Sequence, residues 1–231
     1  MSGLVETPAG TTPRTVLGID EAGRGSLVGP LMVGGFLAAE DRLGELTELG
    51  VRDSKALSPS RREEIFEELP RVGRTFLVVL SPAAVDRAVG RGRLNDLELS
   101  AFARIVRDAH PDVAYADACD PVAARFGRRL SAQARTGCVV HARHKADRDL
   151  PVVGAASIVA KVHRDRALAE LRATLGAGLG SGYPSDTATV AFVRKVLAAG
   201  GSAPVWLRAS WSTTERYIRA RPARPLERFG P

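Results

Sequence analysis

Short apolar runs of strand type alternate along this chain with segments of helical periodicity, and this alternation limits the folds open to it. We predict strands over 15–19, 28–39, 74–80, 112–117 and 136–142. We predict helices over 59–69, 94–109, 121–133, 151–175, 187–199 and 212–220. The first two strands follow each other too closely for a helix to connect them. The pattern therefore predicts an α/β fold with a mixed central sheet flanked by helices.

The chain is long enough, at 231 residues, to bury a hydrophobic core without disulfides or structural metals. Residues 1–14 are rich in Thr, Pro and Gly, and we expect a flexible leader there. We expect one domain over 15–221, with a helical C-terminal subdomain that starts at about residue 151. Residues 222–231 then form a flexible tail.

The sequence argues against a secreted or membrane protein. It has no apolar run near the ~18 residues of a membrane span, and no secretory signal at its start. Its two cysteines, Cys119 and Cys138, form no CxxC pair, so we expect reduced thiols and no zinc site. We expect a cytoplasmic monomer that does not bind membranes.

The positive charge of the chain is concentrated in one half. Residues 1–115 contain 14 Lys and Arg against 17 Asp and Glu, whereas residues 116–231 contain 19 against 9. A basic half indicates a polyanionic partner such as nucleic acid. A solvated surface in an arginine-rich protein is the alternative, and charge alone leaves it open.

Four carboxylates lie at the edges of predicted buried elements. Asp20 and Glu21 follow the first strand, Asp117 ends the fourth strand, and Asp147 precedes the long helix. Adjacent strand residues point to opposite faces, but a turn can bring Asp20 and Glu21 near one cation. Clustered carboxylates repel unless a cation joins them, and oxygen ligands suit Mg²⁺ or Mn²⁺. Two such ions about 4 Å apart can hydrolyse a phosphodiester without His or Cys. Each acid taken alone is more simply a turn or helix cap.

A glycine turn, Gly23-Arg24-Gly25, follows the first two acids directly. Glycines allow backbone to pass close to a ligand, and their N–H groups can hold an anion. A dinucleotide-binding turn is the rival interpretation. The spacing GRGSLVG differs from GxGxxG, and two adjacent acids would repel a pyrophosphate.

Six motifs, in order, resemble the motif series of the ribonuclease HII family. They are GIDEAGRG (18–25), RDSK (52–55), YADA (115–118), HKAD (144–147), AASIVAKVHRDRA (155–167) and GSGYPSD (180–186). Their forms are closer to the archaeal and eukaryotic branch than to the common bacterial one. One departure is Ser26, where a proline usually follows the glycine turn.

The resemblance implies a ribonuclease H-like fold and a metal-dependent endonuclease. The implied substrates are RNA–DNA hybrid duplexes and DNA containing ribonucleotides, cut 5′ to the ribonucleotide to leave 3′-hydroxyl and 5′-phosphate ends. The resemblance also implies that Asp20, Glu21, Asp117 and Asp147 are the catalytic ligands of two Mg²⁺ or Mn²⁺ ions.

The resemblance also assigns the residues that bind the substrate. The glycine turn and Tyr183 would sense the 2′-hydroxyl at an RNA–DNA junction. The implied phosphate contacts are Arg52, Ser54, Lys55, Ser157 and Lys161. Lys145 lies near Asp147 and is either a further phosphate contact or part of a structural ion pair.

Two other classes of function stay open at this point. A non-catalytic binder of RNA–DNA hybrids would need the fold and the basic surface but not the four acids. A different nuclease or a transposase-type enzyme on the same fold would not need the glycine turn and the tyrosine. Cleavage of a duplex with a single ribonucleotide, with and without EDTA, distinguishes the three.

Overall fold

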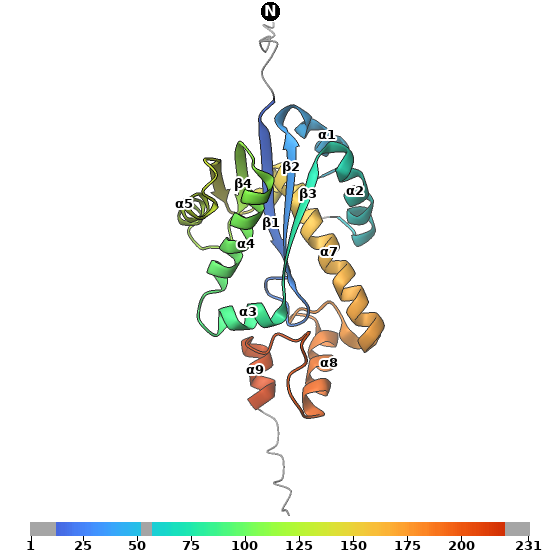
Figure 1. Cartoon of the computed structure of the whole chain (residues 1–231). Helices are drawn as coiled ribbons and strands as arrows, with labels where there is room; N and C mark the ends of the chain where they lie inside the picture. The colour runs from blue at the N-terminus through green and yellow to red at the C-terminus, as the bar shows by residue number, and fades with distance from the viewer. Residues whose placement is uncertain (1–12, 52–56, 220–231) are drawn as a thin grey trace, which may run out of the picture.

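The computed structural model describes residues 13–51 and 57–219, and its centre is a mixed five-stranded sheet (Figure 1). The strands are β1 (Thr15–Ala22), β2 (Leu31–Ala39), β3 (Arg74–Leu80), β4 (Val113–Asp117) and β5 (Val139–Arg143). Their order across the sheet is β3-β2-β1-β4-β5. The first three strands are antiparallel, whereas β4 and β5 run parallel to β1. The predicted mixed α/β fold is confirmed.

Helices cover both faces of this sheet. The α-helices of the described residues are α1 (Leu43–Glu48), α2 (Pro59–Val72), α3 (Pro82–Val89), α4 (Leu94–Ala109), α5 (Ala123–Ala134), α6 (Ala146–Asp149), α7 (Pro151–Leu175), α8 (Thr187–Ala198) and α9 (Ser212–Arg219). Two 3₁₀ turns, Glu40–Arg42 and Ala177–Leu179, connect some of them. No helix among the described residues is long and apolar enough to cross a membrane.

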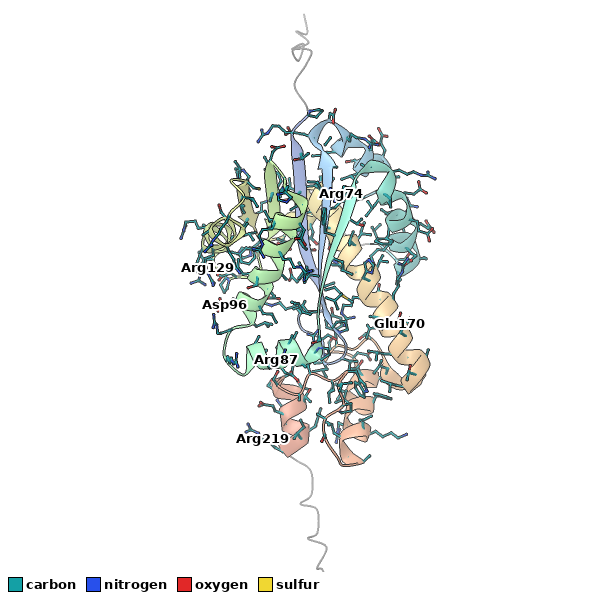
Figure 2. All side chains as sticks on the ribbon, viewed as in Figure 1. Arg74, Arg87, Asp96, Arg129, Glu170 and Arg219 are labelled. Carbon is teal, nitrogen blue, oxygen red and sulfur yellow. The ribbon has the colours of Figure 1, made fainter. Side chains whose placement is uncertain are left out.

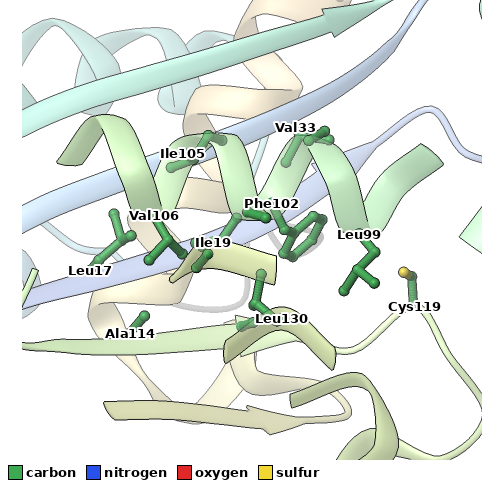
Figure 3. Close-up of a cluster of buried hydrophobic side chains, with 14 of the residues drawn as sticks. Leu17, Ile19, Val33, Leu99, Phe102, Ile105, Val106, Ala114, Cys119 and Leu130 are labelled. Atoms are coloured by element: carbon green, nitrogen blue, oxygen red, sulfur yellow. The ribbon is translucent and has the colours of Figure 1, made fainter. Parts of the chain in front are cut away.

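One face of the sheet packs against α4 and α5. Leu17 and Ile19 of β1 meet Phe102 of α4 and Leu130 of α5 in a fully buried cluster (Figure 3). The opposite face packs against α1, α2 and α7, where Val16 belongs to the cluster of apolar side chains. Because side chains alternate along a strand, neighbouring residues of β1 enter these two separate cores.

Helix α7 lies unusually close to β1 and β2. A Cβ atom built at Gly18 would lie 2.1 Å from the carbonyl oxygen of Val152, and one at Gly34 would lie 2.4 Å from that of Ala156. Real Cβ atoms do not make such contacts, so both positions require glycine for this approach. The absence of two side chains thus places α7 directly over the end of β1.

The elements after α7 form a separate apolar cluster beyond the ends of β1 and β3. Leu179, Val193 and Leu207 pack there with Val28 and Leu168. Figure 1 shows α8 and α9 side by side at this end of the molecule, with Arg219 on the outer end of α9 (Figure 2). The helical C-terminal half therefore divides, because α7 belongs to the sheet layers and α8 and α9 do not. The exact domain bounds stay a prediction.

Several predicted bounds differ from the structure for local reasons. β1 was predicted to stop at residue 19, but it continues to Ala22 because residues 20–22 pair with β2. β2 begins later than residue 28, after Gly29 adopts a φ of +79°. β5 begins after Gly137, with a φ of +73°. Helices 94–109 and 151–175 match their predicted ranges.

Candidate active site

Asp20 and Glu21 leave β1 on opposite faces of the sheet. Asp20 follows the alternation of Gly18, which contacts α7, and it is 4% exposed. Glu21 follows that of Ile19, which packs against α4. Both acids are paired in the strand ladder, so the prediction that β1 ends before them is wrong. Both nevertheless line the same cavity at this end of the strand.

Asp20 instead meets two carboxylates from other parts of the chain. Asp117 ends β4, the parallel neighbour of β1, and Asp147 lies in the short helix α6. One oxygen from each of the three side chains lies within 4.8 Å of the others. The backbone N–H of Ala146 donates to the Asp117 carboxylate at 3.3 Å, which fixes α6 beside β4. Sequence segments about thirty and a hundred residues apart thus converge on one point.

The electrostatics of this cluster fit a divalent cation. Burial raises the pKa of Asp20, and Asp147 adds to the shift, whereas Lys161 and a hydrogen bond from Ser157 oppose it. Burial, followed by repulsion from Asp20, raises the pKa of Asp117 to about 6. Carboxylates held together at this cost are stabilised when a hard cation binds their oxygens. The donor set is entirely oxygen, as Mg²⁺ and Mn²⁺ prefer.

Glu21 borders the cluster from the α4 side and is not among the three converging acids. Burial raises its pKa well above the ordinary value, and repulsion from Asp20, Glu98 and Asp117 raises it further. Glu98, on α4, was not identified from the sequence. It is fully buried, and burial raises its pKa to about 7. The only signal in the sequence was its position: Glu98 lies four residues after Leu94 and four before Phe102, on the apolar face of the helix.

The glycine turn is held from three sides. The guanidinium of Arg24 lies 3.1 Å from the Glu98 carboxylate and donates to the Asn95 side chain at 2.6 Å and to the Cys119 carbonyl at 2.9 Å. Arg208, fully buried, donates to the carbonyl oxygen of Arg24 at 2.9 Å. The side chain of Arg24, which was predicted to contact substrate, therefore also anchors the turn to α4.

The two glycines of the turn serve different purposes. Gly23 has a φ of +87°, and a Cβ atom there would lie 2.2 Å from Nε of Arg164. Gly25 is exposed, and a Cβ atom there would meet no atom within 4 Å. Gly23 thus permits close packing within the protein, whereas the backbone at Gly25 is open to a ligand.

The predicted phosphate-binding residues are only partly within the described structure. Lys161 of α7 donates to Ser157, one helical turn earlier, at 2.5 Å, and both stand beside Asp20. Lys145 is exposed and has a φ of +60°, and its backbone N–H donates to Asp117. The RDSK stretch, with Arg52, Ser54 and Lys55, lies outside the described residues, as do the predicted tail and nearly all of the leader.

Tyr183 lies in the loop between α7 and α8 and lines the same cavity as the glycine turn. Its side chain is half-buried, and its ring lies 4.8 Å from the guanidinium carbon of Arg164. Asp186 shapes this loop, because its carboxylate accepts from the backbone N–H of Ser181 at 2.5 Å and from that of Ala188 at 2.9 Å.

A cavity of about 500 Å³ joins these parts. Its lining is Asp20, Glu21, Ala22, Gly23, Arg24, Gly25, Arg62, Asp117, Lys161, Arg164, Asp165, Leu168, Arg172, Ser181 and Tyr183. Arg62, Arg164 and Arg172 were not identified from the sequence. For Arg164 a signal existed, since it follows Lys161 by three residues and so shares its helix face.

A larger hollow, of about 670 Å³, lies elsewhere, between α4, α5 and Trp211. Its arginines are paired with acids: Arg93 and Arg129 with Asp96, and Arg125 with Asp120 (Figure 2 shows Asp96 beside Arg129). Its lining lacks the three converging aspartates, so the smaller cavity is the candidate active site.

A mixed sheet with a buried and a half-buried aspartate near the ends of two adjacent parallel strands indicates a hydrolase of the ribonuclease H-like fold. Comparison with known proteins agrees. The family model described as Ribonuclease HII matches residues 17–214. The Ribonuclease HII of Cenarchaeum symbiosum is 43% identical over 93% of this chain and 99% of its own length. That of Methanocorpusculum labreanum is 42% identical over 87% of this chain and 92% of its own.

Solved structures give the same result. The ribonuclease HII of Archaeoglobus fulgidus, determined in a complex with PCNA, superposes with a TM-score of 0.80 and 38% identity, covering 87% of this chain and 96% of its own. The chain therefore belongs to the ribonuclease HII family, whose members are metal-dependent hydrolases. Both curated relatives are archaeal, as the forms of the motifs predicted.

Proposed function

We propose that this protein is an endonuclease that hydrolyses the RNA strand of RNA–DNA hybrids. We propose further that it cuts 5′ to ribonucleotides embedded in duplex DNA and leaves 3′-hydroxyl and 5′-phosphate ends. The observation that carries the proposal is the placement of Asp20, Asp117 and Asp147 within 4.8 Å of one another. Asp20 and Asp117 line a cavity that also contains the glycine turn and Tyr183.

The three converging aspartates would hold the divalent ions, with Glu21 as the fourth ligand from the α4 side. Bound there, two Mg²⁺ or Mn²⁺ ions would supply an activated water and charge stabilisation for the leaving 3′ oxygen. The raised pKa values of Asp20 and Asp117 support this assignment, because a cation relieves the repulsion that produces them.

The other residues of the cavity would bind and orient the substrate. Lys161, with Ser157 beside it, presents a positive charge next to Asp20 and would hold the phosphate that is cut. The open backbone at Gly25 would form hydrogen bonds with a 2′-hydroxyl, its N–H as donor or its carbonyl oxygen as acceptor. Tyr183 would stack on the adjacent sugar. Lys145, and the predicted contacts Arg52, Ser54 and Lys55, would hold neighbouring phosphates.

The duplex itself would be held through its backbone, without reading base sequence. The basic half of the chain supplies Lys161 and Arg172 to the cavity for such contacts. Contacts of this kind release counterions, so binding should weaken steeply as salt increases.

Cleavage of three matched duplexes tests the proposal: a uniform RNA–DNA hybrid, DNA with one ribonucleotide, and DNA alone. We expect the first two to be cut in Mg²⁺ or Mn²⁺ and none in EDTA. Products mapped to the nucleotide should end 5′ to the single ribonucleotide. Binding of the hybrid without cleavage in either metal would instead establish a non-catalytic binder, and cleavage of plain DNA a different nuclease.

A further inference from the structure

Arg164 of α7 is a buried charge without an acidic partner. It is 3% exposed, and no carboxylate in the described part of the chain forms an ion pair with it. A buried arginine without a counter-ion is costly, so its neighbours must compensate. The neighbours are the ring of Tyr183, the hydroxyl of Ser26 and the backbone of Gly23.

These three contacts come from the two sides of the cavity. The guanidinium carbon stands 4.8 Å from the centre of the Tyr183 ring, and Nη2 donates to the Ser26 hydroxyl at 2.6 Å. Nε has no hydrogen-bond partner and lies 2.2 Å from the place where a Cβ atom of Gly23 would stand. Arg164 therefore fills the space between the glycine turn and the tyrosine.

Ser26 fastens the same two parts by a second route. It is fully buried, and its oxygen lies 2.7 Å from the carbonyl oxygen of Gly182 and 2.8 Å from that of Val28. The hydroxyl has one proton, so it donates to one of these carbonyls at a time while accepting from Arg164. The N–H of Leu27 also donates to the Gly182 carbonyl, at 2.7 Å. Gly182 directly precedes Tyr183 in the chain.

We propose that Arg164, anchored by Ser26, is a positioning residue that fixes the Tyr183 ring at a set distance from the glycine turn. It thereby sets the preference for a single ribonucleotide in DNA over a uniform hybrid. This inference rests on the proposed function, because it assigns Tyr183 and the turn to the recognition of an RNA–DNA junction. The planar guanidinium is required, since it stacks on a ring and donates sideways at once, which an ammonium does not do.

The test compares kcat/KM on the single-ribonucleotide duplex with that on the uniform hybrid. In both Arg164→Lys and Arg164→Met we expect kcat/KM on the single-ribonucleotide duplex to fall on the order of 30-fold. In the same variants kcat/KM on the uniform hybrid should fall by less than about 3-fold. Ser26→Ala should lower the same ratio about 3-fold, because it removes one anchor only. Arg166→Met is the matched control. Arg166 lies on α7, like Arg164, but its guanidinium stacks on Phe66 of α2 at 4.9 Å, away from the cavity. The ratio of the two kcat/KM values should not change in this variant.

A double-mutant cycle with Tyr183→Ala separates positioning from direct contact. If Arg164 acts through Tyr183, Arg164→Met adds less than about 2-fold in the Tyr183→Ala background. Multiplicative losses, or equal losses on both duplexes, would show that Arg164 contacts phosphate itself and would overturn the inference. Melting temperatures identify variants that fail to fold, for which Arg164→Lys serves as the second variant.

Binding in EDTA gives a readout without chemistry. The ratio of Kd for plain DNA to Kd for the single-ribonucleotide duplex should fall in Arg164→Met and stay constant in Arg166→Met. A wild-type protein that cuts only uniform hybrids would refute the junction activity, whereas a wild-type protein that cuts both with an unchanged ratio in Arg164→Met would refute only the positioning role.

Discussion

Replacing Gly34 with alanine should move α7 away from the sheet and impair cleavage, although it alters none of the four acids proposed to bind metal. Gly34 pairs with Asp20 across the β1–β2 ladder, and α7 lies directly above it. The new Cβ atom would lie 2.4 Å from the carbonyl oxygen of Ala156 and 2.7 Å from the nitrogen of Ala160. Ordinary contact begins at 3.4 Å, so the helix must move by about 1 Å.

The magnitude follows from that displacement. Overpacking of a tight core costs about 1–3 kcal/mol, which for a chain of this size lowers Tm by roughly 2–12 °C. The moved segment includes Ser157 and Lys161, which stand beside Asp20. A shift of about 1 Å in groups near the reacting atoms reduces turnover on the order of 100-fold.

Thermal unfolding and steady-state cleavage of the uniform hybrid measure the two effects. Gly44→Ala in α1 is the control, because a Cβ atom there meets nothing within 4 Å. It should raise stability by about 0.5–1 kcal/mol, since alanine suits a helix better than glycine, and leave cleavage unchanged. If Gly34→Ala melts and cleaves like the wild type, the close approach of α7 does not position the site.

Three further predictions concern the carboxylates and the cysteines. Asp20→Asn should abolish turnover while the hybrid still binds in a fluorescence anisotropy titration; near-normal cleavage would refute its role. In EDTA, Asp117→Asn should unfold at a higher Tm than the wild type at pH 7, with the gap closing at pH 4. The pKa of Asp117 rises from 3.8 to about 6 on folding, so its charge opposes folding as pH increases through this window, by at most about 3 kcal/mol. Saturating Mg²⁺ should reverse that order, and an unchanged order would argue against metal binding at Asp117. Cys119 and Cys138 are buried free thiols with raised pKa values, so iodoacetamide should modify them only after unfolding.

The sequence predicted the long elements well, because their patterns are repeated many times. Helix 151–175 shows both a proline at its first turn and a sustained apolar surface. The Ser58–Pro59 signal correctly marked α2, and the side chain of Ser58 accepts from the N–H of Arg61 as a cap. Ser81–Pro82 repeats that signal and begins α3, which was not predicted. A helix of eight residues offers too few periodic positions to stand out from its neighbours.

The candidate site was predictable in its residues but not in its arrangement. Motif order identified the acids, yet only the strand register shows that Asp20 faces α7 and Glu21 faces α4. Glu98 and Arg208 were missed because each lies alone in its segment, and their importance comes from tertiary contacts with Arg24. The monomeric state and the cytoplasmic location stay predictions.

The contact between Arg208 and the glycine turn means that the turn is completed only late in the synthesis of the chain. Its guanidinium binds the carbonyls of Arg24 and Gly29, residues that leave the ribosome far earlier. At about 5–20 residues per second, Arg208 is synthesised roughly 10–40 s after Arg24, so the turn lacks these hydrogen bonds during that time. We therefore expect a nascent chain stalled before residue 208 to have a folded sheet but an incompletely ordered glycine turn, so that nuclease activity begins late in translation.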